Sequence, residues 1–180
     1  NIYATYTVDR EGFIDVSKAI KQTTEKINEI EKTNYKSNVY TSFESHGFIN
    51  RMNELGANEW YDGMTIHPYS GSVSGGTNAE AFYDDAMKKA ESVGIQKVRE
   101  YVERLPKGKV PVISEYGIFR NTESQVRSQT HALYIAKVIM EYVKLGSPYI
   151  QKHCLSDWYS SGADSLGPTQ QAVIQVVAQD

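Results

Sequence analysis

A glutamate that directly follows an apolar run has the setting of a catalytic carboxylate at a strand end. Residues 109–114 (KVPVIS) are almost entirely apolar, as in a strand buried on both faces, and Glu115 follows them at once. A second strand-like run, residues 61–67 (YDGMTIH), ends in His67 and is followed shortly by Tyr69. If the two runs are parallel neighbours, we expect these three side chains at one edge of the sheet.

The chemistry that suits these residue types is the cleavage of a glycosidic bond. That reaction needs one carboxylic group as acid on the leaving oxygen and a second as nucleophile or base on the other side of the sugar. Glu115 fits the second role, and Tyr69 is placed to hydrogen-bond it and hold its orientation and ionised state. His67 is predicted to contact the substrate. A solvated loop Glu and a buried structural His are the alternative interpretations.

Further residues after the strand ends are typical of a sugar-binding cleft, in a chain with 13 Tyr and 2 Trp. Trp158 offers a flat apolar face for stacking on a sugar ring, and Asp157 can accept from a hydroxyl. Tyr116 is expected to contact the substrate as well. Glu44, after the first strand, either reaches the same cleft or begins a helix, where the dipole favours a carboxylate. Trp60 is predicted to pack at the opposite end.

The elements that must position these residues alternate along the chain. Apolar periodicity, caps and breakers predict helices over 12–32, 48–55, 79–105, 121 or 122–145 and 169–178, and strands over 38–43, 61–67, 109–114 and 149–155. The order is a helix followed by four βα units, which predicts an α/β fold with a parallel sheet. No glycine-rich phosphate loop follows any strand, which disfavours nucleotide-binding folds.

Three of the helices carry an apolar face, and we expect that of the helix that ends near Leu145 to point inward. In the first, this face consists of Phe13, Val16, Ile20, Ile27 and Ile30. In the helix over 79–105, which Gly94 weakens locally, it consists of Phe82, Met87, Ala90, Val98, Val102 and Leu105. In the helix that ends near Leu145, it consists of Leu133, Ala136, Met140 and Val143.

Length and composition favour one ordinary globular domain. The chain has 180 residues, is 40% hydrophobic and 23% charged, and has a net charge of −3, so nothing points to nucleic acid or a charged membrane surface. No apolar run approaches the roughly 20 residues that span a bilayer. We expect a soluble protein, secreted or cytoplasmic, without a metal or organic cofactor. The single cysteine, Cys154, excludes an internal disulfide.

Three segments together resemble a known set of enzymes. Residues 61–69, 110–117 and 132–136 are similar to segments of the retaining glycoside hydrolases of clan A, which are TIM barrels, and within it of the α-L-arabinofuranosidase-like families. In that clan the sixth strand ends in a His-x-Tyr arrangement and the seventh in the nucleophile. The resemblance therefore implies that His67, Tyr69 and Glu115 belong to such a site.

One departure from the clan's pattern bears on how much of the barrel is present. The clan's acid/base Glu stands in an Asn-Glu pair that ends the fourth strand, and no strand end here carries one. The resemblance thus implies that residues 1–180 are the C-terminal half of a (β/α)8 catalytic domain, about strands five to eight, with the acid/base outside them. A full barrel typically has about 250 residues. An isolated half is expected to dimerise or to pair with the missing half-barrel.

Two other classes of function remain open from the sequence. A non-catalytic carbohydrate-binding module would use Tyr69, Tyr116 and Trp158 as a stacking platform. A small doubly wound domain would fit the α/β order, but it lacks a nucleophile elbow or a phosphate loop.

Overall fold

A small parallel sheet forms the centre of the molecule. The computed structural model describes residues 10–41, 44–73, 78–118 and 128–153. Within them, β1 (Tyr40–Thr41), β2 (Gly63–Ile66) and β3 (Val110–Ile113) form a three-stranded parallel sheet in that order. Beyond β3, Ile150 makes a single parallel bridge to Ile113. This bridge extends the sheet past β3, and the order along the sheet still follows the order along the chain. The predicted α/β architecture with parallel βα units is confirmed at this level.

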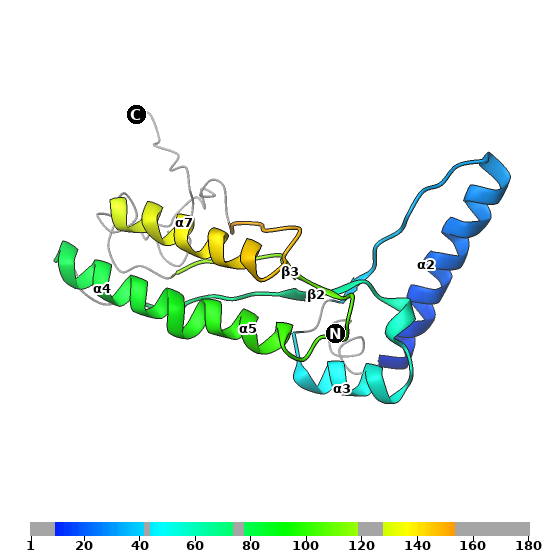
Figure 1. The fold of residues 1–180 in the computed structure, drawn as a ribbon, viewed down its shortest axis with the longest axis horizontal. Helices are drawn as coiled ribbons and strands as arrows, with labels where there is room; N and C mark the ends of the chain where they lie inside the picture. The colour runs from blue at the N-terminus through cyan, green and yellow to red at the C-terminus, as the bar shows by residue number, and fades with distance from the viewer. Residues whose placement is uncertain (1–9, 42–43, 74–77, 119–127, 154–180) are drawn as a thin grey trace, which may run out of the picture.

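The helices surround this sheet unevenly. They are α2 (Arg10–Glu31), α3 (His46–Glu54), α4 (Ala79–Lys89), α5 (Gln96–Val102) and α7 (Gln129–Lys144), with a 3-10 turn over Asn58–Trp60 and a π-helical segment over Ala90–Ile95. In Figure 1, α4 and α5 form one continuous rod along the sheet, α7 lies beside it, and α2 projects away at the other end of the molecule.

Short polar side chains and glycines set the helix ends. Ser45, Asn78 and Ser128 begin α3, α4 and α7, and each side chain accepts a hydrogen bond from the backbone N–H three residues further on. Gly56 and Gly146 have φ values of +63° and +86°, a backbone region that favours glycine, and they follow the ends of α3 and α7. The predicted ends at these two glycines are confirmed.

The predicted helix over 79–105 is confirmed over most of its length, from Ala79 to Val102, with a π-helical segment in its middle. Phe82, Ala90 and Val98 are buried in the core, and Met87, Val102 and Leu105 pack against it. Trp60 also packs at the edge of this core, as predicted, and Lys18 lies 5.3 Å from the centre of its ring.

The predicted inward face of α7 is wrong. Leu133, Met140 and Val143 are 51%, 57% and 59% exposed, whereas the buried positions include Tyr134 and Tyr142. The helix has apolar side chains all round, and the two tyrosines enter the core because their hydroxyls find hydrogen-bond acceptors there. Its predicted start at Asn121 or Thr122 is also wrong, because Ser128 has an extended conformation and caps a helix that begins at Gln129.

The predicted apolar face of α2 is mostly exposed as well. Phe13 packs edge-on against Phe48, but Val16, Ile20, Ile27 and Ile30 are exposed. The helix contacts the rest of the chain mainly through its first half, where Ile14 and Ser17 are buried. An apolar stripe shows which face of a helix avoids water, but it is buried only where another element covers it. The second half of α2 extends past the sheet (Figure 1).

Candidate functional site

The carboxyl ends of β2 and β3 bring together the three residues on which the predicted site depends. Ile66 and Ile113 are register partners in the two parallel strands, so the residues that follow them emerge side by side. The Tyr69 hydroxyl donates a hydrogen bond to Glu115 Oε2 at 2.9 Å. His67 Nδ1 lies 3.9 Å from the same oxygen. The sequence prediction that these three side chains share one rim is confirmed.

The orientation of the His67 ring is fixed by Ser114. His67 Nε2 lies 2.8 Å from Ser114 Oγ, and this hydroxyl can act as donor or acceptor. A proton on Nδ1 would be attracted by the Glu115 carboxylate 3.9 Å away, whereas a lone pair there would be repelled by it. Electrostatics therefore favours Nε2 as the acceptor of the Ser114 hydroxyl and Nδ1–H as the group that faces Glu115.

The Glu115 carboxylate is accessible rather than buried. Its side chain is 39% exposed and that of His67 is 43% exposed. Among the residues that the structure describes, Tyr69 and His67 both approach the same carboxylate oxygen, Oε2. Oε1 is thus the oxygen that can approach an incoming ligand, while Tyr69 holds the other.

A buried hydrogen-bond network fixes the two loops behind this pair. The Ser70 backbone N–H donates to the Gly117 carbonyl at 2.9 Å and joins the loop after β2 to the loop after β3. The Tyr134 hydroxyl from α7 donates to the same carbonyl at 2.9 Å and lies 2.9 Å from Ser70 Oγ, which donates to it in turn. Tyr69 is adjacent to Ser70 and Glu115 is two residues before Gly117, so this network connects α7 to the two loops that carry them.

The π-helical segment packs closely against the same loop. A Cβ on Gly94 would lie 2.5 Å from Ser70 Oγ and 3.2 Å from the Pro68 carbonyl oxygen and the Tyr142 hydroxyl. Only glycine permits this approach, and π-helical turns occur often at functional sites. From the sequence, Gly94 is predicted only to weaken the helix locally. The structure shows that it makes room for the loop that carries Tyr69.

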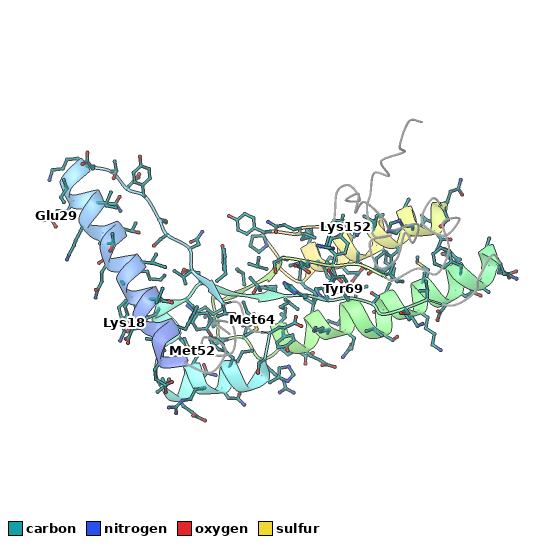
Figure 2. The ribbon with its side chains drawn as sticks, turned by 180° about the vertical axis from the view of Figure 1, so that it is seen from behind. Lys18, Glu29, Met52, Met64, Tyr69 and Lys152 are labelled. Atoms are coloured by element: carbon teal, nitrogen blue, oxygen red, sulfur yellow. The ribbon has the colours of Figure 1, made fainter. Side chains whose placement is uncertain are left out.

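Sequence reasoning missed Ser114, Ser70 and Tyr134. Ser114 and Ser70 are adjacent to Glu115 and Tyr69, so their position beside a candidate catalytic pair was the available signal. Tyr134 had a weaker one, a phenol on the same helix face as Thr130, His131 and Tyr142. Figure 2 shows Tyr69 and Lys152 on the side of the molecule away from α2, with the buried Met52 and Met64 nearer to α2.

Tyr116, which the sequence analysis expected to contact a substrate, is placed in the core. Its side chain is 1% exposed, its ring packs edge-on against Tyr142 with centroids 5.9 Å apart, and burial raises the pKa of its hydroxyl to about 12. Lys152 Nζ lies 5.8 Å from the ring centre. The prediction of a ring exposed in the cleft is wrong in this structure, because the residue after Glu115 points to the helices rather than to the rim.

Glu44 lies close to the site but beneath it. Its carboxylate accepts hydrogen bonds from the His67 backbone N–H and from Lys97 Nζ, and its side chain is 31% exposed. It does not cap the following helix, since Ser45 does. Asp157 and Trp158, the remaining predicted substrate contacts, lie outside the described residues.

The described ranges contain neither a cluster of metal ligands nor a helix that could span a membrane. No group of three or more His, Cys, Asp or Glu side chains in these ranges is arranged to hold a metal ion. In the same part of the chain, no helix is both long and apolar enough to cross a bilayer.

Comparisons with known proteins provide no relative: no family model matches the chain, and neither a curated protein nor a solved structure is significantly similar to it.

Proposed function

We propose that the chain is the nucleophile-bearing half of a retaining glycoside hydrolase with a (β/α)8 barrel, and that Glu115 is its nucleophile. The observation that carries the proposal is the hydrogen bond of 2.9 Å from the Tyr69 hydroxyl to Glu115 Oε2, at the carboxyl ends of two adjacent parallel strands. In barrel enzymes this end of the sheet holds the active site.

The geometry supports a nucleophile rather than a general acid. A nucleophilic carboxylate needs one oxygen held in place and the other directed at the anomeric carbon. Tyr69 holds Oε2, and the 39% exposure of the side chain leaves the carboxylate open to solvent. In the mechanism that we propose, Glu115 forms the glycosyl-enzyme ester, and an acid/base carboxyl outside this chain assists departure of the leaving group.

The alternative of a non-catalytic carbohydrate-binding module loses support. That interpretation relied on three aromatic rings, and the ring of Tyr116 is buried. It also provides no reason for a tyrosine hydroxyl to hold a carboxylate oxygen at the end of a strand.

Mechanism-based labelling tests the proposal without the missing acid. The chain is incubated with 2-fluoro glycosides that carry a dinitrophenolate leaving group, in arabinofuranosyl and glucosyl versions, because such leaving groups depart with little acid catalysis. Intact-mass spectrometry and peptide mapping then measure the adduct.

We expect one fluoroglycosyl unit per chain, attached to Glu115, with one of the two sugars. The variant Asp62→Asn, which alters a carboxylate at the other end of the sheet, should label like the parent. A chain that stays folded and unlabelled with both sugars, also after the missing half-barrel has been supplied, would contradict the proposal.

A further inference from the structure

Both backbone polar groups of His67 are held from outside its own strand. β2 ends at Ile66, and the next N–H, that of His67, donates to Glu44 Oε2 at 2.5 Å. The carbonyl of His67 accepts from Lys97 Nζ at 3.1 Å and from the Tyr69 N–H at 2.9 Å. The carboxylate of Glu44 thus provides the hydrogen-bond acceptor that the carbonyl of a neighbouring strand would otherwise provide for the His67 N–H.

Glu44 and Lys97 are also partners of one another. Lys97 Nζ donates to Glu44 Oε1, so the two carboxylate oxygens bind two different donors. The side chains are 33% exposed for Lys97 and 31% for Glu44, and charge-assisted bonds in such a partly buried setting are stronger than those of exposed pairs. The pair connects α5 to the ends of β1 and β2, and each member binds one of the two opposite backbone groups of the same residue.

The position of this backbone determines what the His67 ring can reach. The ring already contacts Ser114 through Nε2, and its Nδ1 stands 3.9 Å from Glu115 Oε2, about 1 Å beyond hydrogen-bond length. A shift of His67 by a fraction of an ångström therefore changes how the ring faces the carboxylate and any ligand in front of it. Functional groups need to be held within about 0.5 Å to act well.

We propose that Glu44 and Lys97 are a positioning pair that sets the place of His67 in the site. Neither residue touches the substrate, so Glu44, which the sequence analysis expected in the cleft, acts from beneath it. The kinetic consequence of this inference rests on the proposed function. The structural consequence, a displaced His67, is independent of the proposed function.

The test compares Lys97→Met and Glu44→Gln with Arg99→Met. Arg99 lies on the same helix, is 36% exposed, and pairs with Glu91 and Glu141 instead. Lys97→Met removes the bond to the His67 carbonyl, while Glu44→Gln keeps an amide oxygen as acceptor but removes the charge. Thermal unfolding followed by circular dichroism identifies any variant that fails to fold. If one of the two variants does not fold, the other still tests the proposal.

The first readout is the NMR spectrum of the folded chain, which needs no sugar. We expect the His67 amide proton to move upfield in Glu44→Gln, since its short bond to a carboxylate is weakened, and the His67 ring signals to move in Lys97→Met. Arg99→Met should leave both unchanged. Unmoved His67 signals in both variants, or equal movement in Arg99→Met, would overturn the positioning role whatever the kinetics show.

The second readout separates binding from chemistry in the labelling reaction. Because Tyr69 still holds Glu115, we expect the half-saturating concentration of the 2-fluoro glycoside to rise about 3- to 10-fold in Lys97→Met, with the maximal labelling rate less affected. The double variant Lys97→Met, Glu44→Gln should be little worse than either single variant, as expected of residues that act together. Shifted His67 signals in a chain that never labels would support the positioning pair and contradict the proposed function.

Discussion

Asp62 and Glu115 are carboxylates at opposite ends of the same small sheet, and their surroundings differ in kind. Asp62, just before β2, binds Lys21 Nζ with both oxygens at 3.0 Å and accepts from the Val39 N–H at 2.7 Å. Glu115, just after β3, faces a tyrosine hydroxyl and a histidine, both on one oxygen. The first carboxylate is saturated by a cation and backbone, which stabilises the fold. The second is oriented by a phenol and left accessible, which suits a group that reacts.

The largest effect should come from removing the reactive carboxylate itself. Glu115→Gln is nearly the same size and keeps an acceptor for Tyr69, but an amide is a poor nucleophile. Turnover of dinitrophenyl glycosides is measured with the chain paired with the missing half-barrel. We expect turnover to fall on the order of 10⁴-fold in Glu115→Gln. Asp62→Asn should change the stability of the fold and leave turnover within a few fold. Equal loss of turnover in the two variants would remove the distinction between the two ends of the sheet.

The next largest effect should come from the group that orients Glu115. Tyr69→Phe deletes the hydroxyl that donates to Oε2 and leaves the ring in place. A hydrogen bond to a charged group contributes about 1.5–3 kcal/mol, so the maximal labelling rate should fall roughly 10- to 100-fold. Tyr83→Phe, at an exposed tyrosine of α4, provides the matched control. A rate unchanged in Tyr69→Phe would show that Glu115 needs no orienting partner.

The packing behind the site should show the third effect. Gly94→Ala places a methyl group 2.5 Å from Ser70 Oγ, and we expect it to destabilise the fold by about 1–3 kcal/mol in urea unfolding. The same change should slow labelling, because Ser70 belongs to the loop of Tyr69. Ser92→Ala, an exposed position in the same π-helical segment, should do neither. A Gly94→Ala variant with unchanged stability and a normal labelling rate would show that the Ser70 loop can move aside without destabilising the fold or the site.

The smallest effect concerns pH. Burial raises the pKa of Tyr116 to about 12, and it also raises that of Tyr142, whereas an unfolded tyrosine ionises near 10. Below pH 10 both states are neutral. Above it only the unfolded chain loses the proton, so stability falls as the pH rises, by about 1 kcal/mol per buried tyrosine at pH 11. Urea midpoints measured from pH 8 to 11 should fall less steeply in Tyr116→Phe than in Tyr35→Phe, which alters an exposed tyrosine. Equal slopes would contradict the burial of Tyr116.

The parts of the site that the sequence made predictable are those that depend on strand ends. Two adjacent parallel strands that end just before His67 and shortly before Glu115 place both residues at one edge, and Tyr69 follows from the same geometry. The direction of Tyr116 was not predictable, because the alternation of side chains breaks down where a strand gives way to a loop.

The helix faces were harder to predict for a related reason. Periodicity identified α2 and the long α4 to α5 helix, and it gave the buried face of the latter correctly. On α2 it did not reveal that most of the apolar face would stay exposed. On α7 the hydroxyl of Tyr134 decided the buried face through its bond to the Gly117 carbonyl, a long-range contact that no local pattern encodes. The Glu44 and Lys97 pair, 53 positions apart, lay beyond sequence reasoning for the same reason.

Azide rescue of Glu115→Ala tests the central claim most directly, because the small side chain leaves space for an external nucleophile where Glu115 stands. The variant is assayed with a dinitrophenyl glycoside of the sugar that labels the parent, with and without sodium azide, beside Asp62→Ala. We predict that azide restores release of dinitrophenolate in Glu115→Ala alone and yields a glycosyl azide of the opposite anomeric configuration. A Glu115→Ala variant that hydrolyses the substrate as fast as the parent, or that azide fails to rescue, would contradict the assignment of Glu115 as the nucleophile.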